Sequence, residues 1–295
     1  DVKKDEYMST ILVPGQIEAS AVAPPFLHLP PKGLFALRAE RLELLAADNA
    51  LGDYLWLIAR LCQARADEIA AGTAPHDLAT KIMTTRDPVS GETFTTEEMI
   101  DQVAIFFLAG HETSASALSW ALYLLALYPQ VQDRVAAEAV SLGQAPDFAE
   151  LSKLKYTRDV FREVLRLYPP VPMMVRENRC PETMRDRNVA PGAQMVLSPW
   201  HLHRHERIWP NPDAFDPDRW QTEENRACAR DAYLPFSTGP RVCTGAGFAM
   251  VEGPLLLAML VRDWQFARIE GRDPVPVAHL TVRAKDGIRL KITRR

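Results

Sequence analysis

The sequence predicts a mainly helical protein with a minor share of β-sheet. Three observations favour this fold class. Apolar residues recur at helical spacing over 34–71, and a long apolar stretch over 95–128 contains no proline. Short strand-like segments lie within 171–200 and 275–293. The chain has 295 residues, of which 47% are hydrophobic and 24% charged, and this is ample for one large core.

Local patterns predict the elements in the first half of the chain. Residues 1–33 have no clear period, and the prolines within 24–31 exclude a regular helix there. Residues 86–94 predict a turn or a small hairpin. Thr95 and Glu98 form a capping-box pattern at the start of the long apolar helix. Because that helix is apolar on nearly every side, the pattern predicts that it passes through the middle of the protein.

Prolines and glycines delimit the elements of the second half. Three further helices are expected, at 129–142, 155–168 and 245–262. Pro254 is expected to bend the last of them. Residues 201–235 are rich in Pro, Asp and Arg and lack any period, so we expect a long loop that carries function.

Composition and charge exclude several classes of protein. A net charge of −4 gives no sign of a nucleic-acid binder, which would carry a basic excess. The four cysteines lack paired spacing, so a reducing cytoplasm is the expected setting. The longest apolar runs, 103–109 and 255–261, are far shorter than the ~20 residues of a membrane span. The first residues do not have the pattern of a signal peptide, so none is expected.

The segment that ends at Gly245 reads Phe-Ser-Thr-Gly-Pro-Arg-Val-Cys-Thr-Gly. A cysteine alone is usually a small buried hydrophobe. Here Gly239 and Gly245 permit tight turns on both sides of Cys243, and the next helix would direct its positive N-terminal end at a thiolate. Phe236 would cover the sulfur and exclude water. Arg241 would neutralise a carboxylate of a cofactor.

Two further motifs precede this segment. The long apolar helix contains Ala-Gly-His-Glu-Thr at 109–113, where small residues leave room beside polar ones. Glu163 and Arg166 are spaced as helix neighbours, and Arg219 follows in Pro-Asp-Arg-Trp. Taken singly, these polar residues would be ordinary surface pairs.

Together and in this order, the motifs resemble those of the cytochrome P450 family, whose signature Phe-x-x-Gly-x-Arg-x-Cys-x-Gly is matched at every fixed position. The resemblance covers about 34–293 and implies a cytochrome P450 fold that is partial at its N-terminus. It divides the chain into an irregular segment, 1–33, and a haem-thiolate catalytic domain, 34–295. The implied cofactor is haem b (iron protoporphyrin IX), with Cys243 as the axial ligand of the iron.

The resemblance also implies roles for other residues. The cofactor-binding residues would be Cys243, Arg176, Arg241, Phe236, Gly239, Gly245, Ala109 and Gly110. Glu112 and Thr113 would be the catalytic acid–alcohol pair that organises proton delivery. Glu163, Arg166 and Arg219 would form a buried network for folding and haem retention. The substrate pocket would contain Phe106, Val171, Met173, Met174 and Leu280, although residues of these types are as often plain core.

His201, His203 and His205 alternate as strand neighbours would, which raises the alternative of a metal site. No fourth ligand accompanies them in the sequence, so the pattern favours histidines without a metal. Cys62, Cys180 and Cys228 are expected to be structural.

Three functional hypotheses follow. The first is a monooxygenase that inserts one atom of dioxygen into an apolar substrate of the fatty acid, hydrocarbon or terpenoid type. Its electrons would come from a separate ferredoxin or flavin reductase, since no flavin- or nucleotide-binding region is visible. The second keeps the haem but uses peroxide or isomerises an oxygenated lipid. The third is a truncated, non-catalytic fragment, because nothing in 1–33 replaces the segment that family members carry there. The Glu112–Thr113 pair favours the first hypothesis.

Overall fold

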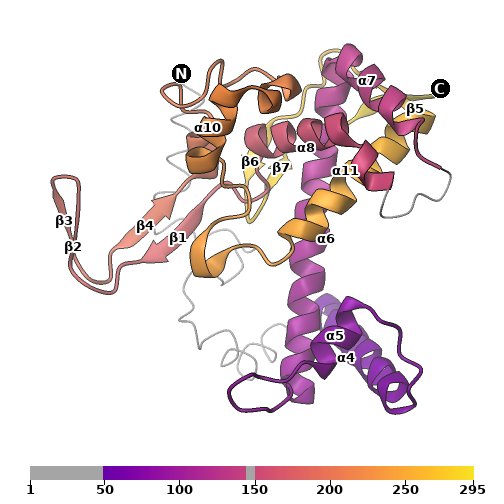
Figure 1. The fold of residues 1–295 in the computed structure, drawn as a ribbon, viewed down its shortest axis with the longest axis vertical. Coiled ribbons are helices and arrows are strands. Elements are labelled where there is room, and N and C mark those ends of the chain that lie inside the picture. The colour runs from indigo at the N-terminus through magenta and orange to yellow at the C-terminus, as the bar shows by residue number, and fades with distance from the viewer. Residues whose placement is uncertain (1–48, 144–149) are drawn as a thin grey trace. The chain divides into compact units, whose positions relative to one another are not determined.

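The computed structural model describes residues 49–143 and 150–295 and is mainly helical with small sheets, which confirms the predicted fold class (Figure 1). Contacts within the chain divide it into two compact units, here called the N-terminal unit (described over 49–111) and the C-terminal unit (from residue 112 onward). The predicted boundary near residue 33 lies outside the described residues and stays a prediction.

Helices are the main regular structure of both units. The α-helices are α4 (Asn49–Ala70), α5 (Leu78–Thr84), α6 (Thr96–Leu127), α7 (Pro129–Ala139), α8 (Lys155–Leu167), α9 (Pro199–Leu202), α10 (Glu223–Ala232) and α11 (Ala246–Asp263). Short 3₁₀-helices are η2 (Glu150–Lys153), η3 (Pro217–Gln221) and η4 (Gly239–Arg241). No helix in these described ranges combines the length and the apolar character that a membrane span requires.

All of the sheets are antiparallel strand pairs in the C-terminal unit. The strands are β1 (Met174–Glu177), β2 (Glu182–Met184), β3 (Arg187–Val189), β4 (Gln194–Leu197), β5 (Trp264–Arg268), β6 (Pro276–Ala278), β7 (Val282–Ala284) and β8 (Leu290–Arg294). β1 pairs with β4, β2 with β3, β5 with β8, and β6 with β7. β7 and β8 flank the predicted turn at 285–287, yet each pairs with an earlier strand.

Local patterns predicted the start of α6 correctly. The Glu98 amide donates to Thr95 Oγ1 at 3.3 Å, and the Thr95 amide donates to Glu98 Oε2 at 2.9 Å, so the capping box is formed. The predicted hairpin over 86–94 is confirmed by a bridge between Arg86 and Thr93. α4 ends at Ala70, close to the predicted end, while its expected beginning at 34 lies outside the described residues.

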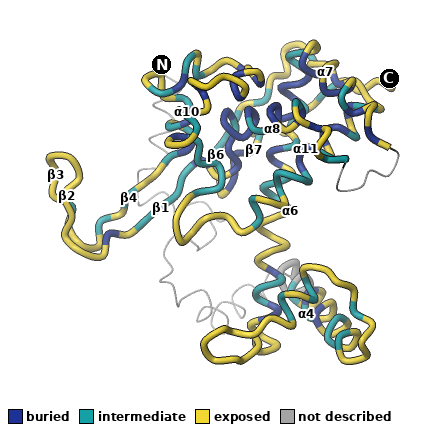
Figure 2. Tube along the Cα trace, in the orientation of Figure 1, coloured by how far each residue is buried: buried dark blue, intermediate teal, exposed yellow. Residues whose placement is uncertain are grey.

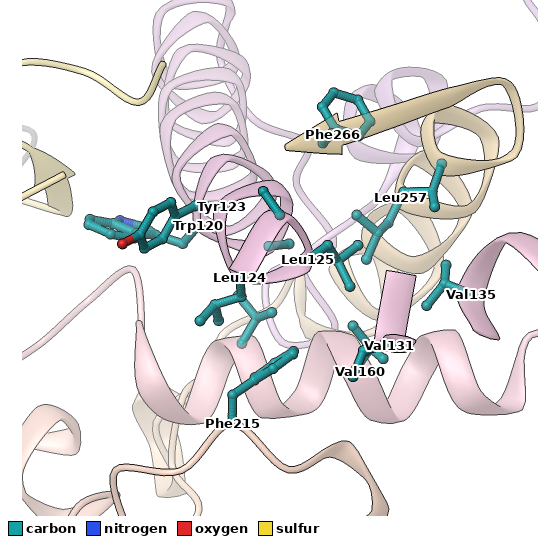
Figure 3. Packing of buried hydrophobic residues seen from close by; sticks show 14 of the residues in the cluster. Trp120, Tyr123, Leu124, Leu125, Val131, Val135, Val160, Phe215, Leu257 and Phe266 are labelled. Carbon is teal, nitrogen blue, oxygen red and sulfur yellow. The ribbon is translucent and has the colours of Figure 1, made fainter. Parts of the chain in front are cut away.

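Each unit has its own apolar core. In the N-terminal unit, Ile58 and Cys62 of α4 pack in one cluster with Met99 of α6. In the C-terminal unit, α6, α7, α8 and α11 contribute to one cluster, in which buried side chains converge between the helices (Figure 3). Gln132 is buried beside this core, and its side-chain amide donates to the carbonyl oxygens of Leu125 and Phe266, both at 2.9 Å. These bonds join α7 to α6 and to β5.

The middle of α6 is exposed, so the prediction that the whole helix is buried is wrong for residues 105–111 (Figure 2). Phe107 is 57% exposed. The reason is that α6 packs at its two ends: Met99 and Ala104 belong to one core, and the residues after Ser116 to the other. An apolar surface that belongs to neither core is typical of a binding surface.

The expected aperiodic loop over 201–235 is also partly wrong, because α10 occupies Glu223–Ala232. Thr222 caps this helix through its hydroxyl, which accepts from the Asn225 amide at 3.4 Å. α10 buries only two of its ten residues, Asn225 and Ala232, so it lacks the apolar period that identifies most helices. The capping residue was the only local signal.

A close approach of α8 and α11 depends on Gly253. A Cβ atom at this position would lie 2.2 Å from Phe161 Cζ, and the nearest three atoms all belong to the Phe161 ring. Phe161 is itself buried and cannot move aside freely. The two helices can therefore pack at this distance only because residue 253 has no side chain.

Gly253→Ala is expected to lower the free energy of unfolding by about 1–3 kcal/mol, because overpacking displaces a buried ring. Urea unfolding followed by far-ultraviolet circular dichroism measures this change. Gly247→Ala is the matched control in the same helix, since its Cβ would meet no atom within 4 Å. Equal stability of the two variants would show that the α8–α11 contact does not require glycine.

Candidate functional site

Cys243 lies in a short loop between η4 and α11 that is closed by main-chain hydrogen bonds. Its amide donates to the Phe236 carbonyl oxygen at 2.8 Å, and the Val242 amide donates to the Gly239 carbonyl oxygen at 3.0 Å. Ser237 and Gly239 have left-handed backbones, with φ of 64° and 71°. This geometry exposes Cys243 at the surface of the loop.

Gly239 and Gly245, the two glycines of the loop, have different structural roles. Gly239 adopts the left-handed conformation that its predicted tight turn requires. Gly245 lies in the turn that the Ala246 amide closes onto the Cys243 carbonyl oxygen at 3.4 Å, but its φ of −85° is one that any residue can adopt. A Cβ at Gly245 would lie 3.8 Å from Cys243 Sγ. Glycine therefore leaves space beside the sulfur, close to a helix N-terminus that favours negative charge.

Phe236 connects the loop to the core. Its half-buried ring packs against a cluster that contains Ala117 of α6, Phe161 and Leu165 of α8, and Met250 of α11. The backbone of Phe236 also accepts the bond from the Cys243 amide. The position of the cysteine is thus fixed relative to these helices.

Two predicted arginines lie at the loop. Arg176 of β1 donates from its guanidinium to Ser237 Oγ at 3.2 Å and to the Val175 carbonyl oxygen at 3.0 Å. Arg241 lies in η4, two residues before Cys243, and is exposed. Within 49–143 and 150–295, neither guanidinium forms an ion pair with an aspartate or glutamate. Both cations are therefore able to bind carboxylates of a ligand.

The structure brings Glu163, Arg166 and Arg219 together in a buried network, although 56 residues separate the first from the last. Arg166 donates to both Glu163 carboxylate oxygens, at 3.0 and 2.9 Å. Arg219 Nε donates to Glu163 Oε1 at 2.8 Å. One carboxylate thus holds two guanidinium groups, and all three side chains are almost fully excluded from solvent.

The same arginines organise the segment that precedes η3. Arg166 donates to the carbonyl oxygens of His203 at 2.8 Å and Ala214 at 2.9 Å. Arg219 donates to the carbonyl oxygen of Pro210 at 2.9 Å. A chain segment without regular structure thereby has its carbonyl groups satisfied by charged donors. These hydrogen bonds from Arg166 and Arg219 to backbone carbonyl oxygens are the physical basis for the folding role predicted for the network.

His203 belongs to this arrangement, and sequence reasoning missed its role. It follows α9 rather than lying in a strand, which removes the basis for the alternating His201–His203–His205 pattern. No group of three or more potential metal-binding side chains occurs among the described residues. The His203 ring is fully buried, and its Nε2 accepts from the Leu234 amide at 2.8 Å. Nδ1 therefore carries the proton and donates to the Arg166 carbonyl oxygen at 3.2 Å.

Burial lowers the pKa of His203 from 6.5 to about 3, against a smaller opposing effect of its hydrogen bond to the Arg166 backbone. Between these two pH values the unfolded chain binds a proton that the folded protein does not. This contribution to stability is complete above pH 6.5 and is lost as the pH falls toward 3. We expect the free energy of unfolding to fall by up to about 1.4 kcal/mol per pH unit from this residue.

This pH dependence is tested by urea unfolding of the wild type and of His203→Gln on both sides of pH 6.5. The stability difference between the two proteins should shrink in acid. His279→Gln replaces an exposed histidine and should keep the wild-type pH dependence. A constant difference between wild type and His203→Gln at all pH values would contradict the neutral buried state.

The predicted acid–alcohol pair lies on α6. Glu112 Oε1 accepts from Arg283 Nε at 2.9 Å and from Thr281 Oγ1, so the β6–β7 hairpin holds this carboxylate. Thr113 is half-buried beside it in the sequence. Ala109 and Gly110, one turn earlier on α6, are exposed. Sequence reasoning placed Glu112 in a relay but did not identify Arg283 as its partner.

None of the predicted pocket residues is fully buried. Val171, Leu280 and Phe106 are exposed, while Met173 and Met174 are half-buried. Their role in a pocket stays a prediction.

The residues of the loop fit haem. A thiolate is a ligand for haem iron, and the Cys243 side chain is accessible rather than packed in a core. Haem also carries propionates, and Arg176 and Arg241 present guanidinium groups at the same loop. Val242, next to the cysteine, is an exposed apolar residue suited to contact with a flat apolar macrocycle.

Comparisons with known proteins agree with this geometry. The family model for Cytochrome P450 matches residues 46–292. Cyclooctatin synthase of Streptomyces melanosporofaciens is 36% identical over 80% of this chain and 53% of its own length. Cyclooctat-9-en-7-ol 5-monooxygenase of the same organism is 35% identical over 68% of this chain and 44% of its own. The crystal structure of the cytochrome P450DA heme domain superposes with a TM-score of 0.74 at 30% identity, over 83% of this chain and 54% of that one.

The chain thus spans about half the length of the curated relatives that it matches. The residues that the family model matches include the cysteine loop, the Glu163 network and the Glu112–Thr113 segment. These motifs and the extent of the matches lead to one conclusion. The chain belongs to the cytochrome P450 family.

Proposed function

We propose that the protein is a haem-thiolate monooxygenase. The balanced reaction joins an apolar substrate RH with dioxygen, two electrons and two protons, and yields ROH and water. The observation that carries the proposal is the Cys243 loop, which presents an accessible cysteine beside two arginines that are not paired with acidic residues of the described chain. The name of the relative cyclooctat-9-en-7-ol 5-monooxygenase supports the same class of reaction.

The loop would hold the cofactor. When bound, a haem with a thiolate ligand supplies the electron density that favours cleavage of the oxygen–oxygen bond. Cys243 would be the iron ligand, and Arg176 and Arg241 would bind the propionates. Phe236, fixed in its cluster, would keep water away from the sulfur, while Gly245 leaves space beside it.

Glu112 and Thr113 would move protons. The reaction consumes two of them, and a carboxylate next to a hydroxyl can hold and pass protons through water. The half-buried position of both residues is compatible with access by water. This pair favours dioxygen with an external electron donor over peroxide, because peroxide already carries the protons and electrons. A ferredoxin or a flavin reductase is the proposed donor.

The substrate is proposed to be apolar, of the fatty acid, hydrocarbon or terpenoid type. Val171, Met173, Met174 and Leu280, all in the C-terminal unit, would line its pocket. All four are apolar side chains, and all four lie outside the buried cores. Methionine fits such a role because its flexible side chain adapts to irregular ligands.

The test uses the full-length protein reconstituted with haem. Reduction under carbon monoxide should give the red-shifted Soret band of a thiolate-ligated haem. Turnover of lauric acid with a surrogate ferredoxin, its reductase and isotopically labelled dioxygen should place one labelled atom in the product. Absence of haem would overturn the proposal, and product formed only with added peroxide would replace it with a peroxygenase.

A further inference from the structure

Two residues of the β6–β7 hairpin bind the same carboxylate oxygen of Glu112. Arg283 contributes an ion pair, with its Nη2 2.6 Å from Glu112 Oε1, and Thr281 donates its hydroxyl to the same oxygen. The residues lie about 170 positions from Glu112 in the sequence, at separations of 171 and 169. This contact therefore exists only in the folded chain.

Val282, the residue between Thr281 and Arg283 and the first residue of β7, is hydrogen-bonded to α6. The Val282 carbonyl oxygen accepts from Ser116 Oγ at 2.6 Å and from Trp120 Nε1 at 3.2 Å. The Val282 amide donates to the Pro170 carbonyl oxygen at 2.9 Å. Glu112, Ser116 and Trp120 are spaced four residues apart, so they share one face of α6. This face of α6 thus contacts β7 and the residue before it.

The anchored strand determines where its neighbours point. Thr281 lies in the bend directly before β7 and Arg283 lies within β7, and both side chains reach Glu112 Oε1. Thr281 and Val282 are each only 2% exposed, which makes the Thr281 hydroxyl a rigid donor. The Arg283 side chain is 58% exposed and that of Glu112 26%. An ion pair with that much solvent access adds little to stability.

We propose that Thr281 and Arg283 are positioning residues that fix the orientation of the Glu112 carboxylate for proton delivery. The inference rests on the proposed function of Glu112. Because both groups bind Oε1, they set the rotation of the carboxylate and hence the direction of its second oxygen. Leu280 precedes Thr281 directly, so the same strand joins the proposed substrate pocket to the proton relay.

The kinetic test uses the haem-loaded full-length protein with lauric acid, a surrogate ferredoxin and its reductase. Arg283→Met should lower kcat about 10-fold, a part of the 10²–10⁴ that a positioned proton-transfer group contributes, and should leave KM unchanged. The solvent isotope effect on kcat and the share of electrons lost to hydrogen peroxide should both rise. Thr281→Val should act in the same direction. Arg283→Lys and Thr281→Ser should restore most of the rate.

A second readout does not depend on turnover. The unfolding temperatures of the wild type, Glu112→Gln, Arg283→Met and the double variant are compared in a double-mutant cycle. If the contact exists, the double variant should unfold at about the same temperature as the less stable single variant. Arg268→Met is the matched control, because Arg268 forms an exposed ion pair with Asp273 in the same unit. It should change neither the isotope effect nor the peroxide yield.

The outcomes separate the two proposals. A normal thiolate-haem band in Arg283→Met together with wild-type kcat, isotope effect and peroxide yield overturns the positioning role and leaves the monooxygenase proposal intact. Failure of the wild-type protein to bind haem overturns both. Loss of rate in Arg283→Met that Arg283→Lys does not restore also overturns the positioning role, because a positioned cation should be replaceable by another.

Discussion

Replacing Cys243 by serine is expected to abolish the thiolate-haem spectrum and reductase-driven turnover completely. A serine hydroxyl is not deprotonated at neutral pH and does not supply the electron density of a thiolate, so the change removes the proposed iron ligand while it preserves the size of the side chain. The loop itself should persist, because its closing bonds come from the backbone of Cys243 and Val242. The measurement is the carbon monoxide difference spectrum of the reduced protein, together with product formation.

Cys180→Ser is the matched control. Cys180 is also an exposed cysteine of the same unit, but it lies between β1 and β2, away from the Cys243 loop in the sequence. This variant should keep the wild-type spectrum and turnover. An unchanged spectrum in Cys243→Ser would disprove the proposed ligand and, with it, the proposed function.

Glu163→Gln is expected to have the largest effect on stability, a loss of about 3–5 kcal/mol in the free energy of unfolding. The substitution keeps the volume of the side chain but removes the single negative charge shared by Arg166 and Arg219. Both guanidinium groups would remain buried without a counter-charge, and the cost of burying them would no longer be offset. Haem content should fall as well, because His203 of the segment that these arginines organise accepts from the amide of Leu234, two residues before Phe236 of the cysteine loop.

Urea unfolding of the haem-free protein measures the loss without interference from cofactor binding. Arg134→Met provides the control, because it breaks an ion pair with Asp218 in which both side chains are more than half exposed. Exposed pairs contribute about 0–1 kcal/mol, so this variant should change stability little. Similar losses of unfolding free energy in Glu163→Gln and Arg134→Met would show that the buried network contributes no more to stability than an exposed ion pair.

The candidate site was predictable wherever the information is local. The cysteine loop occupies ten consecutive residues, and Gly239 adopts the left-handed turn expected of it. The capping box at Thr95 and Glu98 is formed by two neighbours on one helical turn. Glu163 and Arg166 also meet within one turn of α8. In each case, side-chain spacing on a short segment is sufficient to bring the groups together.

Other features could not be predicted, because their partners are far away in the sequence. α10 has a capping residue but no apolar period, since it is mostly exposed. His203 resembles its two neighbouring histidines, and only burial between α8 and Leu234 distinguishes it. The glycine at 253 is explained by the Phe161 ring of another helix.

By itself, the sequence determined the helical fold class, the order of most elements, the family and the chemistry available at Cys243. Only the tertiary structure decided that the middle of α6 is exposed, that His203 is buried against α8, and that the β6–β7 hairpin binds Glu112. The reason is physical: backbone propensity and capping act over a few residues, whereas burial and ion pairing depend on which distant segments the folded chain brings into contact.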